Sequence, residues 1–578
     1  MPNPGTATTQ PYLRATKISS LVSPGVLALR LGGRFATMAA VVTAHLFDVV
    51  VVGAGVAGLV AALDLLDLAP GTRIAVVDKG TIGSTGSTPL AQGGIAAAVG
   101  WDDSPALHAA DTIRSGDGLC DRRAVAVASD EGPARVDDLI SRGVRFDRTA
   151  SGALHLAREG GQSIPRSVHR ADATGAEIFR ALRQTVTGHS NHLGRLQGIA
   201  CELALAQDPD ARVVGVWVLP DEVECSPEGQ GAPGFEQDDG LALLLGRAVL
   251  LATGGCGGLY ASTTNRDEAT ADGVALAYAA GATLVDLEFV QFHPTGLETR
   301  APSGSWRFLL TEALRGAGAT LVDATGQRFM PALHPDAELA PRHIVTKGIL
   351  DQPGGAWIDA TVLSAQRLAE EFPTVLAGAR RYGYDLATEP VPVEPCEHYM
   401  IGGVATDLHG RTSVPGLWAA GEVACTGIHG ANRMAGNSLL QACVFAHRAA
   451  QSIRAWLDSD PGKPVDPSPP GFAADHGLDV EALRTELRAA MSAGAGPIRS
   501  LASLERAAKA LDAAATTLGP APAAIRAHIE VANLVTVGQL IVRSARLREE
   551  SRGVHWRDDF PARAPQWAGV RIRIQRPS

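Results

Sequence analysis

The chain has 578 residues, a net charge of −10, and 46% hydrophobic against 19% charged residues. One hydrophobic core rarely serves that length, so two to four domains are expected. The acidic balance argues against a broad basic surface for nucleic acid, and no apolar stretch reaches the roughly 20 residues that a membrane helix needs. Seven cysteines without a CxxC pair predict no metal site, no disulfide framework and a reducing, cytoplasmic setting.

The first 46 residues differ in composition from the rest. They carry Arg14, Lys17, Arg30 and Arg34 but no acidic residue, a balance that is also typical of targeting peptides. Folding signals begin only after Met38. Residues 1–46 are therefore expected to be a disordered tail, or an extension that results from a start site assigned too far upstream. Both are preferred over a functional targeting signal.

A strand, a glycine turn and a helix are predicted to follow one another from residue 47. Phe47–Val52 is apolar and β-branched, and it continues into the glycine-rich segment Gly53–Gly58 and an apolar helix that runs through Leu68. Arg73–Val77 is then predicted as a second buried strand, which ends at Asp78. This order is that of a βαβ unit.

The glycines of this unit have the spacing of a dinucleotide site. Gly53 permits a tight turn, Gly55 lets the backbone approach a pyrophosphate, and Gly58 allows the helix to pack closely on the strand. The helix N-terminus supplies NH groups and positive potential. Asp78 stands at the distance in sequence expected for an acid that binds ribose hydroxyls. Strand, helix and acid together predict a bound dinucleotide.

Two further apolar segments are predicted to join the same sheet. Leu241–Thr253 is predicted as one buried strand that ends in the glycine run Gly254–Gly258. Gly416–Gly421, with the sequence GLWAAG, predicts another strand that leads to Glu422. Between them, residues 287–399 are richer in Pro, His and Arg, which suggests an inserted domain.

A Pro-rich linker, Asp458–Pro470, precedes a helical region at Leu483–Arg548 that is predicted to form a small bundle. The fold class is therefore α/β, with a Rossmann-like nucleotide-binding domain, an inserted α+β capping domain and a C-terminal helical bundle. The predicted division is 47–286 with 400–457 for the nucleotide-binding domain, 287–399 for the capping domain, and 471–578 for the helical domain and tail.

Four segments concentrate polar residues that a scaffold would not need. They are Arg158–Gly161, Gln291–Thr295, Pro341 with Arg342, and His398 with His429–Arg433. Five motifs accompany them: VVVGAGVAGL at Val50–Leu59, STPLAQGGI at Ser87–Ile95, EFVQFHPT at Glu288–Thr295, LLTEALRGAGA at Leu309–Ala319 and HGANRMAGNSL at His429–Leu439. In this order, and over residues 47 to about 560, the chain resembles flavoproteins of the succinate dehydrogenase and fumarate reductase superfamily. GEVACTGIHGANR and REESRGVHWRDDFP resemble its L-aspartate oxidase branch in particular.

The resemblance implies FAD as the cofactor. The residues implied to hold it are Gly53, Ala54, Gly55, Ala57, Gly58, Asp78, Lys79, Ser84, Gln92, Gly93, Gly94, Thr253, Gly254, Asp272, Glu422, Asn437, Ser438 and Leu439. Some relatives attach the flavin covalently through a histidine near the AQGG segment. This chain has Ser87 there, so noncovalent FAD is expected.

A dicarboxylate substrate needs donors for two carboxylates, and the planar fork of Arg suits that task. Arg433 is the first candidate. The resemblance adds His293 and His398 as residues that contact substrate carboxylates, with Thr311 as a hydroxyl donor and Gln291 beside them. A buried, satisfied core residue is the alternative interpretation for either histidine.

Arg342 matches the family arginine that moves a proton during fumarate reduction. Relatives often have PRD where His343 follows Arg342 here, and Arg where this chain has Lys347. A proton donor and a plain anion clamp therefore both remain open for Arg342.

Glu159 is the residue that separates the branches, because the resemblance places the REGG glutamate near a substrate amine. A carboxylate beside two substrate carboxylates would repel them unless a cation intervened, and an α-ammonium is such a cation. A solvent-facing loop residue is the alternative.

The implied function is oxidation of L-aspartate to iminoaspartate, with dioxygen or fumarate as electron acceptor, in the quinolinate branch of NAD biosynthesis and with functional coupling to quinolinate synthase. A soluble fumarate reductase and a catalytically idle FAD-bearing scaffold are the rivals. No membrane or nucleic-acid partner is expected.

Overall fold

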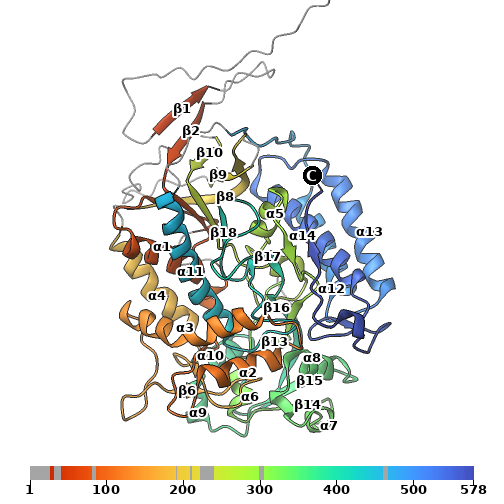
Figure 1. Ribbon diagram of the computed structural model, residues 1–578. Coiled ribbons are helices and arrows are strands. Elements are labelled where there is room, and N and C mark those ends of the chain that lie inside the picture. Colours follow the sequence, from red (N-terminus) through yellow and green to blue (C-terminus); the bar gives the residue numbers. More distant parts are fainter. Residues whose placement is uncertain are drawn as a thin grey trace, which may run out of the picture.

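A computed structural model describes residues 26–30, 41–80, 86–189, 192–207, 211–221, 240–298, 305–459 and 467–577. Its largest feature is a nine-stranded sheet (Figure 1). The strands in spatial order are β1 (Val26–Arg30), β2 (Val41–Leu46), β10 (Ala242–Leu245), β9 (Val213–Pro220), β8 (Leu193–Leu205), β4 (Ile74–Asp78), β3 (Val49–Val52), β11 (Ala248–Leu251) and β18 (Leu417–Ala419). The five strands from β8 to β18 are parallel, whereas β9 runs antiparallel to both of its neighbours.

Alternate side chains of the central strands face two different cores. Val49 and Val51 belong to one buried cluster, and Val50 and Val52 to another, because successive side chains of a strand point to opposite faces. The first face is covered by α1 (Val56–Leu68), α3 (Arg122–Ser141), α4 (Thr174–Thr187) and α11 (Asn437–Ser459), with α2 (Pro105–Ser115) packed on α3. The opposite face meets α5 (Asp272–Ala279) and the C-terminal helices (Figure 1). Burial on both sides explains why these strands are continuously apolar.

The predicted βαβ unit is confirmed as β3, α1 and β4. Val49 pairs with Ile74 in parallel register, and α1 ends at Leu68 as predicted. Both strands begin slightly later than expected, at Val49 and Ile74, and β4 includes Asp78.

The segment Leu241–Thr253 is two strands, which corrects the prediction of one. The strand is interrupted at Gly246, where an added Cβ would lie 2.9 Å from the Val50 side chain. Before the break β10 pairs with β2 and β9, and after it β11 pairs with β3 and β18. The apolar run continues through the break because both strands are buried.

Part of the N-terminal extension is ordered, contrary to expectation. Val41–Leu46 form β2, which pairs with β10, and Ala44 and His45 are buried. Residues 1–25 and 31–40 lie outside the described residues.

A second, antiparallel sheet lies at the lower end of the molecule in Figure 1. Its strands in order are β13 (Val290–Leu297), β16 (Val391–Met400), β15 (Ala356–Asp359) and β14 (Thr320–Asp323). Five helices accompany it: α6 (Glu312–Ala317), α7 (Met330–Leu333), α8 (Arg342–Leu350), α9 (Ala365–Glu371) and α10 (Pro373–Arg381). A separate buried cluster holds these elements together and draws only on residues from 297 to 393. Its own core supports the prediction of an inserted α+β domain.

Three helices form the C-terminal bundle: α12 (Val480–Ala495), α13 (Leu501–Leu518) and α14 (Arg526–Leu547). The bundle begins slightly before the predicted Leu483, because the Asp479 side chain caps α12 by accepting from the Ala482 amide. The tail then returns to the body, where β22 (Arg573–Ile574) pairs with β12 (Leu284–Val285). The α/β class with an inserted domain and a helical bundle is thus confirmed.

Shorter elements complete the description. They are β5 (Ile95–Ala96), β6 (Leu156–Ala157), β7 (Ser167–Val168), β17 (Gly403–Ala405), β19 (Ala424–Cys425), β20 (Ile498–Arg499), β21 (Trp556–Arg557) and the 3-10 turns Thr88–Leu90, Gly257–Leu259, Ala337–Leu339 and Pro565–Trp567. Over the described ranges, no helix is long and apolar enough to cross a membrane. Within the same ranges no group of three His, Cys, Asp or Glu side chains could hold a metal ion.

Candidate active site

A deep cleft opens at the carboxyl ends of β3, β4, β11 and β18, where doubly wound sheets bind ligands. It contains about 1460 Å³ of space between atoms, open solvent included. Thirteen of the residues predicted to hold FAD line it: Gly53, Ala54, Gly55, Ala57, Asp78, Gln92, Gly93, Gly94, Thr253, Gly254, Glu422, Ser438 and Leu439. Most of the residues predicted to hold FAD therefore line one cleft.

The glycine turn between β3 and α1 is a cradle that side chains would fill. Gly53 has a φ of +104°, and an added Cβ would lie 2.3 Å from the Ala252 carbonyl oxygen. At Gly58 a Cβ would meet the Gly53 oxygen at 2.0 Å, so this glycine serves helix packing and does not line the cleft. Asp78 accepts hydrogen bonds from the Ala54 amide at 2.7 Å and the Gly80 amide at 3.0 Å. The open backbone at Gly53 and the N-terminus of α1 fit a pyrophosphate.

Four other residues predicted to hold FAD either do not line the main cleft or lie outside the described residues. Lys79 and Asp272 line a smaller adjoining cleft and form an ion pair of 2.8 Å. Asn437 turns its amide away from the main cleft, toward His108 at 2.9 Å and Thr112 at 3.0 Å. Ser84 lies outside the described residues.

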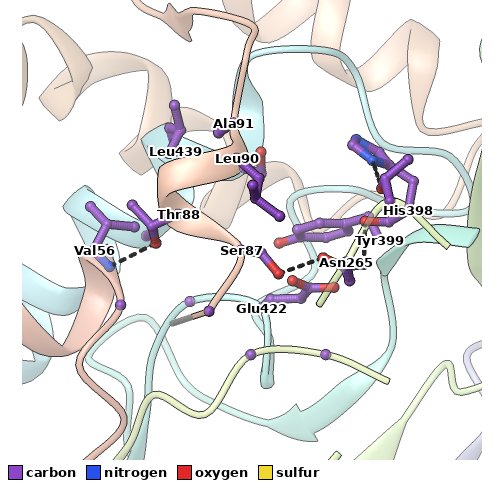
Figure 2. A pocket seen from close by; sticks show the side chains of 18 of the residues that line it. Val56, Ser87, Thr88, Leu90, Ala91, Asn265, His398, Tyr399, Glu422 and Leu439 are labelled. Atoms are coloured by element: carbon purple, nitrogen blue, oxygen red, sulfur yellow. Dashed lines mark hydrogen bonds between the residues drawn. The ribbon is translucent and has the colours of Figure 1, made fainter. Parts of the chain in front are cut away.

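The far wall of the cleft is held by hydrogen bonds between loops. Thr88 accepts from the Val56 amide at 3.1 Å, and Ser87 donates to the Asn265 side chain (Figure 2). The Ser87 hydroxyl is thus already bonded within the protein. Glu422 lies close to this pair in Figure 2, and burial raises the pKa of its carboxyl to about 8.

Two histidines and an arginine meet at one end of the cleft. The Arg433 Nη2 atom lies 2.8 Å from His398 Nε2, and the two imidazole rings of His293 and His398 stand edge to face with centroids 5.1 Å apart. The Arg433 guanidinium also lies over the Tyr399 ring at 4.6 Å. Burial, together with the nearby Arg342, lowers the pKa of Arg433 to about 10, so it remains a cation at neutral pH.

Both histidines are neutral at neutral pH. Burial first, and the arginines around them second, hold the pKa of His293 and His398 well below the ordinary value. They can therefore join hydrogen bonds without adding to the positive charge of Arg433.

Arg342, at the start of α8, is fixed by two side chains. Its Nε donates to Glu312 at 2.7 Å and its Nη1 donates to Gln291 at 3.1 Å. Gln291 in turn donates to the Arg433 carbonyl oxygen at 2.9 Å, which links the two arginines. Thr311 caps α6 and also lines the cleft. All six residues predicted to bind substrate except Gln291 line this cleft directly.

Glu159 is buried at the junction of the dinucleotide cleft and the cationic end. It is 3% exposed and accepts from the Gly94 amide at 2.9 Å, which excludes a solvent-facing loop. Burial, and then the neighbouring Glu312, raise the pKa of Glu159. A group in this state favours either a proton or a cation beside it.

Glu312 and Asn265 were missed by sequence reasoning. Burial opposes the charge of Glu312, but Arg342 and Arg315 outweigh it and lower its pKa, so Glu312 is a carboxylate. It also accepts from the Gly160 amide at 2.9 Å. Its position beside Thr311 in the motif LLTEALRGAGA is the signal that could have found it. Asn265 donates to Glu397 at 3.0 Å, and no sequence pattern marked it.

A dinucleotide cradle that opens onto a cationic, imidazole-lined cavity defines a flavin-dependent oxidoreductase for small acids. The model described as FAD binding domain matches residues 48–439, and the one described as fumarate reductase flavoprotein C-term matches residues 484–575. L-aspartate oxidases of Streptomyces coelicolor and Caulobacter vibrioides are 44% and 41% identical, and the alignments cover 89% and 91% of this chain and 89% and 95% of the relatives. The chain belongs to the L-aspartate oxidase family, and FAD is its cofactor.

Solved structures agree with this placement. A mutated form of Escherichia coli quinol fumarate reductase FrdA superposes with a TM-score of 0.79 at 28% identity, over 90% of this chain and 93% of that one. Mycobacterium smegmatis Sdh1 in complex with UQ1 gives 0.77 at 30% identity, over 92% of each chain. The resemblance to the succinate dehydrogenase and fumarate reductase superfamily is therefore confirmed.

Proposed function

We propose that this chain oxidises L-aspartate to iminoaspartate with noncovalent FAD, and that dioxygen or fumarate takes up the two electrons. The observation that carries the proposal is the buried carboxylate of Glu159 beside a cavity that holds Arg433 and Arg342. A diacid alone would be repelled by Glu159, whereas a diacid with an α-ammonium group satisfies both signs of charge.

Arg433 is proposed to bind one substrate carboxylate through its planar fork. Among the described residues no carboxylate is paired with it at hydrogen-bond distance, so the substrate supplies the balancing charge. Arg342 is proposed to clamp the other carboxylate. Its Nε and Nη1 are already bonded, and Nη2 is left without a protein partner in the described part of the chain. Thr311 adds a hydroxyl donor from the same wall.

Glu159 is proposed to orient the α-ammonium and to accept the proton that it loses. The raised pKa of this carboxyl makes it a better base than a surface glutamate, and the Gly94 amide holds the accepting oxygen in place. When bound in the cleft, FAD supplies the acceptor for the hydride that leaves Cα. The α-ammonium loses one proton to Glu159 and the hydride from Cα, and the resulting iminium releases a second N–H proton to water to give iminoaspartate. The protein contributes orientation and charge placement.

Arg342 is proposed to act as an anion clamp during aspartate oxidation, and to transfer a proton to fumarate when fumarate reoxidises the flavin. The chain is further proposed to work in the cytoplasm, in the quinolinate branch of NAD biosynthesis, where quinolinate synthase consumes the labile imine. The names of its relatives support the activity.

Purified holoprotein mixed with L-aspartate tests the proposal. Anaerobic L-aspartate should bleach the visible flavin absorbance, and air should then give peroxide and oxaloacetate. D-Aspartate controls for the stereochemistry at Cα, L-glutamate for the length of the carbon chain, and succinate for the need for an amino group. Turnover of fumarate with a reduced dye, without oxidation of L-aspartate, would identify a fumarate reductase. Bound flavin with neither activity would identify a scaffold.

A further inference from the structure

A chain of hydrogen bonds leads from Arg433 away from the cavity. Arg433 Nη2 lies 2.8 Å from His398 Nε2, and His398 Nδ1 lies 2.7 Å from Thr264 Oγ1. Thr264 Oγ1 also lies 3.3 Å from the backbone carbonyl oxygen of Glu397. Thr264 is 7% exposed. No motif in the sequence marks it.

Each bond in this chain can run in only one direction. A guanidinium has donors and no acceptor, so His398 Nε2 must present its lone pair to Arg433. A neutral imidazole then carries its proton on Nδ1, and Thr264 Oγ1 must accept it. The hydroxyl hydrogen of Thr264 is left for the Glu397 carbonyl. Every donor in this series of hydrogen bonds has an acceptor, and reversing any one of these bonds would leave the next without a donor or an acceptor.

His293 has the opposite arrangement. The Thr295 amide donates to His293 Nδ1 at 3.2 Å, so the proton of this imidazole is on Nε2. In the described part of the chain Nε2 has no protein partner, and His293 lines the cavity. The two neighbouring histidines therefore carry different tautomers. His293 offers a donor to a substrate carboxylate, and His398 offers an acceptor to Arg433.

Little else fixes the rotation of the Arg433 guanidinium. Its Nη1 makes only a long bond of 3.4 Å to Ser438, and its Nε is buried without a partner among the residues that the structure describes. Tyr399 supports the flat face but leaves rotation within the plane open. His398 is also a neutral acceptor, so it orients the cation without cancelling the charge that a substrate carboxylate needs.

We propose that Thr264 is a positioning residue for substrate binding: it sets the tautomer of His398, and His398 thereby holds the Arg433 fork in register for a carboxylate. The inference rests on the proposed function, since it assigns Arg433 to a substrate carboxylate. It also divides the two histidines, with His293 as the donor to substrate and His398 as the support of Arg433.

Thr264→Val tests the proposal, because valine keeps the shape and removes the hydroxyl. Loss of the hydroxyl leaves the Nδ1 donor of His398 buried and unpaired. We expect the Kd of succinate, read from the flavin spectrum of the holoenzyme, and the KM of L-aspartate each to rise about tenfold. The kcat should stay nearly constant, since the ground state and the transition state lose the same interaction. Thr264→Ser should restore both constants.

Thr346→Val is the matched control. Thr346 is also buried, its hydroxyl donates to the Phe292 carbonyl at 3.4 Å, and it does not line the main cleft. This variant should leave both constants unchanged. Equal succinate affinity in wild type and Thr264→Val would overturn the proposal, as would a serine variant as weak as the valine one.

A spectroscopic measurement on the unaltered holoenzyme covers the case in which Thr264→Val does not fold. The ¹⁵N resonances of His398, assigned by their loss in His398→Asn, should show an unprotonated Nε2 before substrate is added. A protonated Nε2 would overturn the proposal. Because succinate lacks the amine, its binding reports on Arg433 even if L-aspartate is not oxidised. A failure of the proposed function is thus distinguishable from a failure of this inference.

Discussion

Glu159→Gln should separate oxidation of L-aspartate from reduction of fumarate. The substitution keeps the size of the side chain and an oxygen that can accept from the Gly94 amide at 2.9 Å. It removes the charge that we assign to the substrate ammonium. Glu159 is 3% exposed, so water cannot take over that charge.

The size of the effect follows from the strength of a charged hydrogen bond in a buried site. Such a bond contributes about 1.5–3 kcal/mol, and about 1.4 kcal/mol is a factor of ten. We therefore expect kcat/KM for L-aspartate to fall about 10- to 150-fold. Fumarate has no ammonium, so the charge of Glu159 contributes nothing to its binding. Its reduction should be unchanged or faster in the variant.

Steady-state kinetics with peroxide detection and with a reduced dye measure the two rates on one preparation. Glu338→Gln is a suitable control, because Glu338 is also buried but pairs with Arg328 outside the cleft. It should leave the ratio of the two rates at the wild-type value. An equal loss of both rates in Glu159→Gln would refute the assignment of Glu159 to the amine.

Three other outcomes are expected. Arg433→Leu should abolish both activities, and Arg433→Lys should recover little, because an ammonium keeps the charge but lacks the planar fork; both are read from turnover and succinate binding. Burial raises the pKa of Glu422 from 4.5 to about 8, so the folded apoprotein holds a proton that the unfolded chain has lost between these values. The stability that Glu422 contributes to the apoprotein is therefore fully present below pH 4.5 and lost as pH rises to about 8, so Glu422→Gln should remove this part of the pH dependence of Tm. Acid denaturation should release all flavin into the supernatant, since Ser87 offers no imidazole for attachment, and yellow colour retained in the pellet would contradict this.

The sequence predicted the parts of the fold that depend on local pattern. The βαβ unit at Val49–Asp78 was found because apolar periodicity, the glycine spacing and the terminal acid all agree. The interruption at Gly246 was not predicted. Both strands beside it are buried, so hydropathy does not reveal that β10 and β11 pair with different strands. Strand β2 was missed for a related reason, since its place in the sheet depends on β10, about two hundred residues away.

The site was predictable where chemistry is concentrated in motifs and not where it depends on tertiary contacts. Arg433, His293 and His398 stand in polar segments that a scaffold would not need, and the structure brings them together. Asn437 stands in an equally prominent motif, yet its amide is taken by a buried histidine. Thr264 is a common residue type in a loop. Its role becomes visible only in the structure, where its hydroxyl lies between His398 Nδ1 and the Glu397 carbonyl oxygen.

The charges of the cavity account for two kinds of diacid in one site. Glu312 pairs with both Arg342 and Arg315 but carries only one negative charge, and Arg433 is bonded to the neutral His398, so positive charge remains for the substrate. Glu159 is the acid at the junction of the dinucleotide cleft and the cationic end. Its raised pKa means that a proton can neutralise it when the ligand has no ammonium, and that an ammonium can take the place of that proton. The same burial that makes Glu159 selective for an amine thus leaves the cavity open to fumarate, at the cost of one proton taken up.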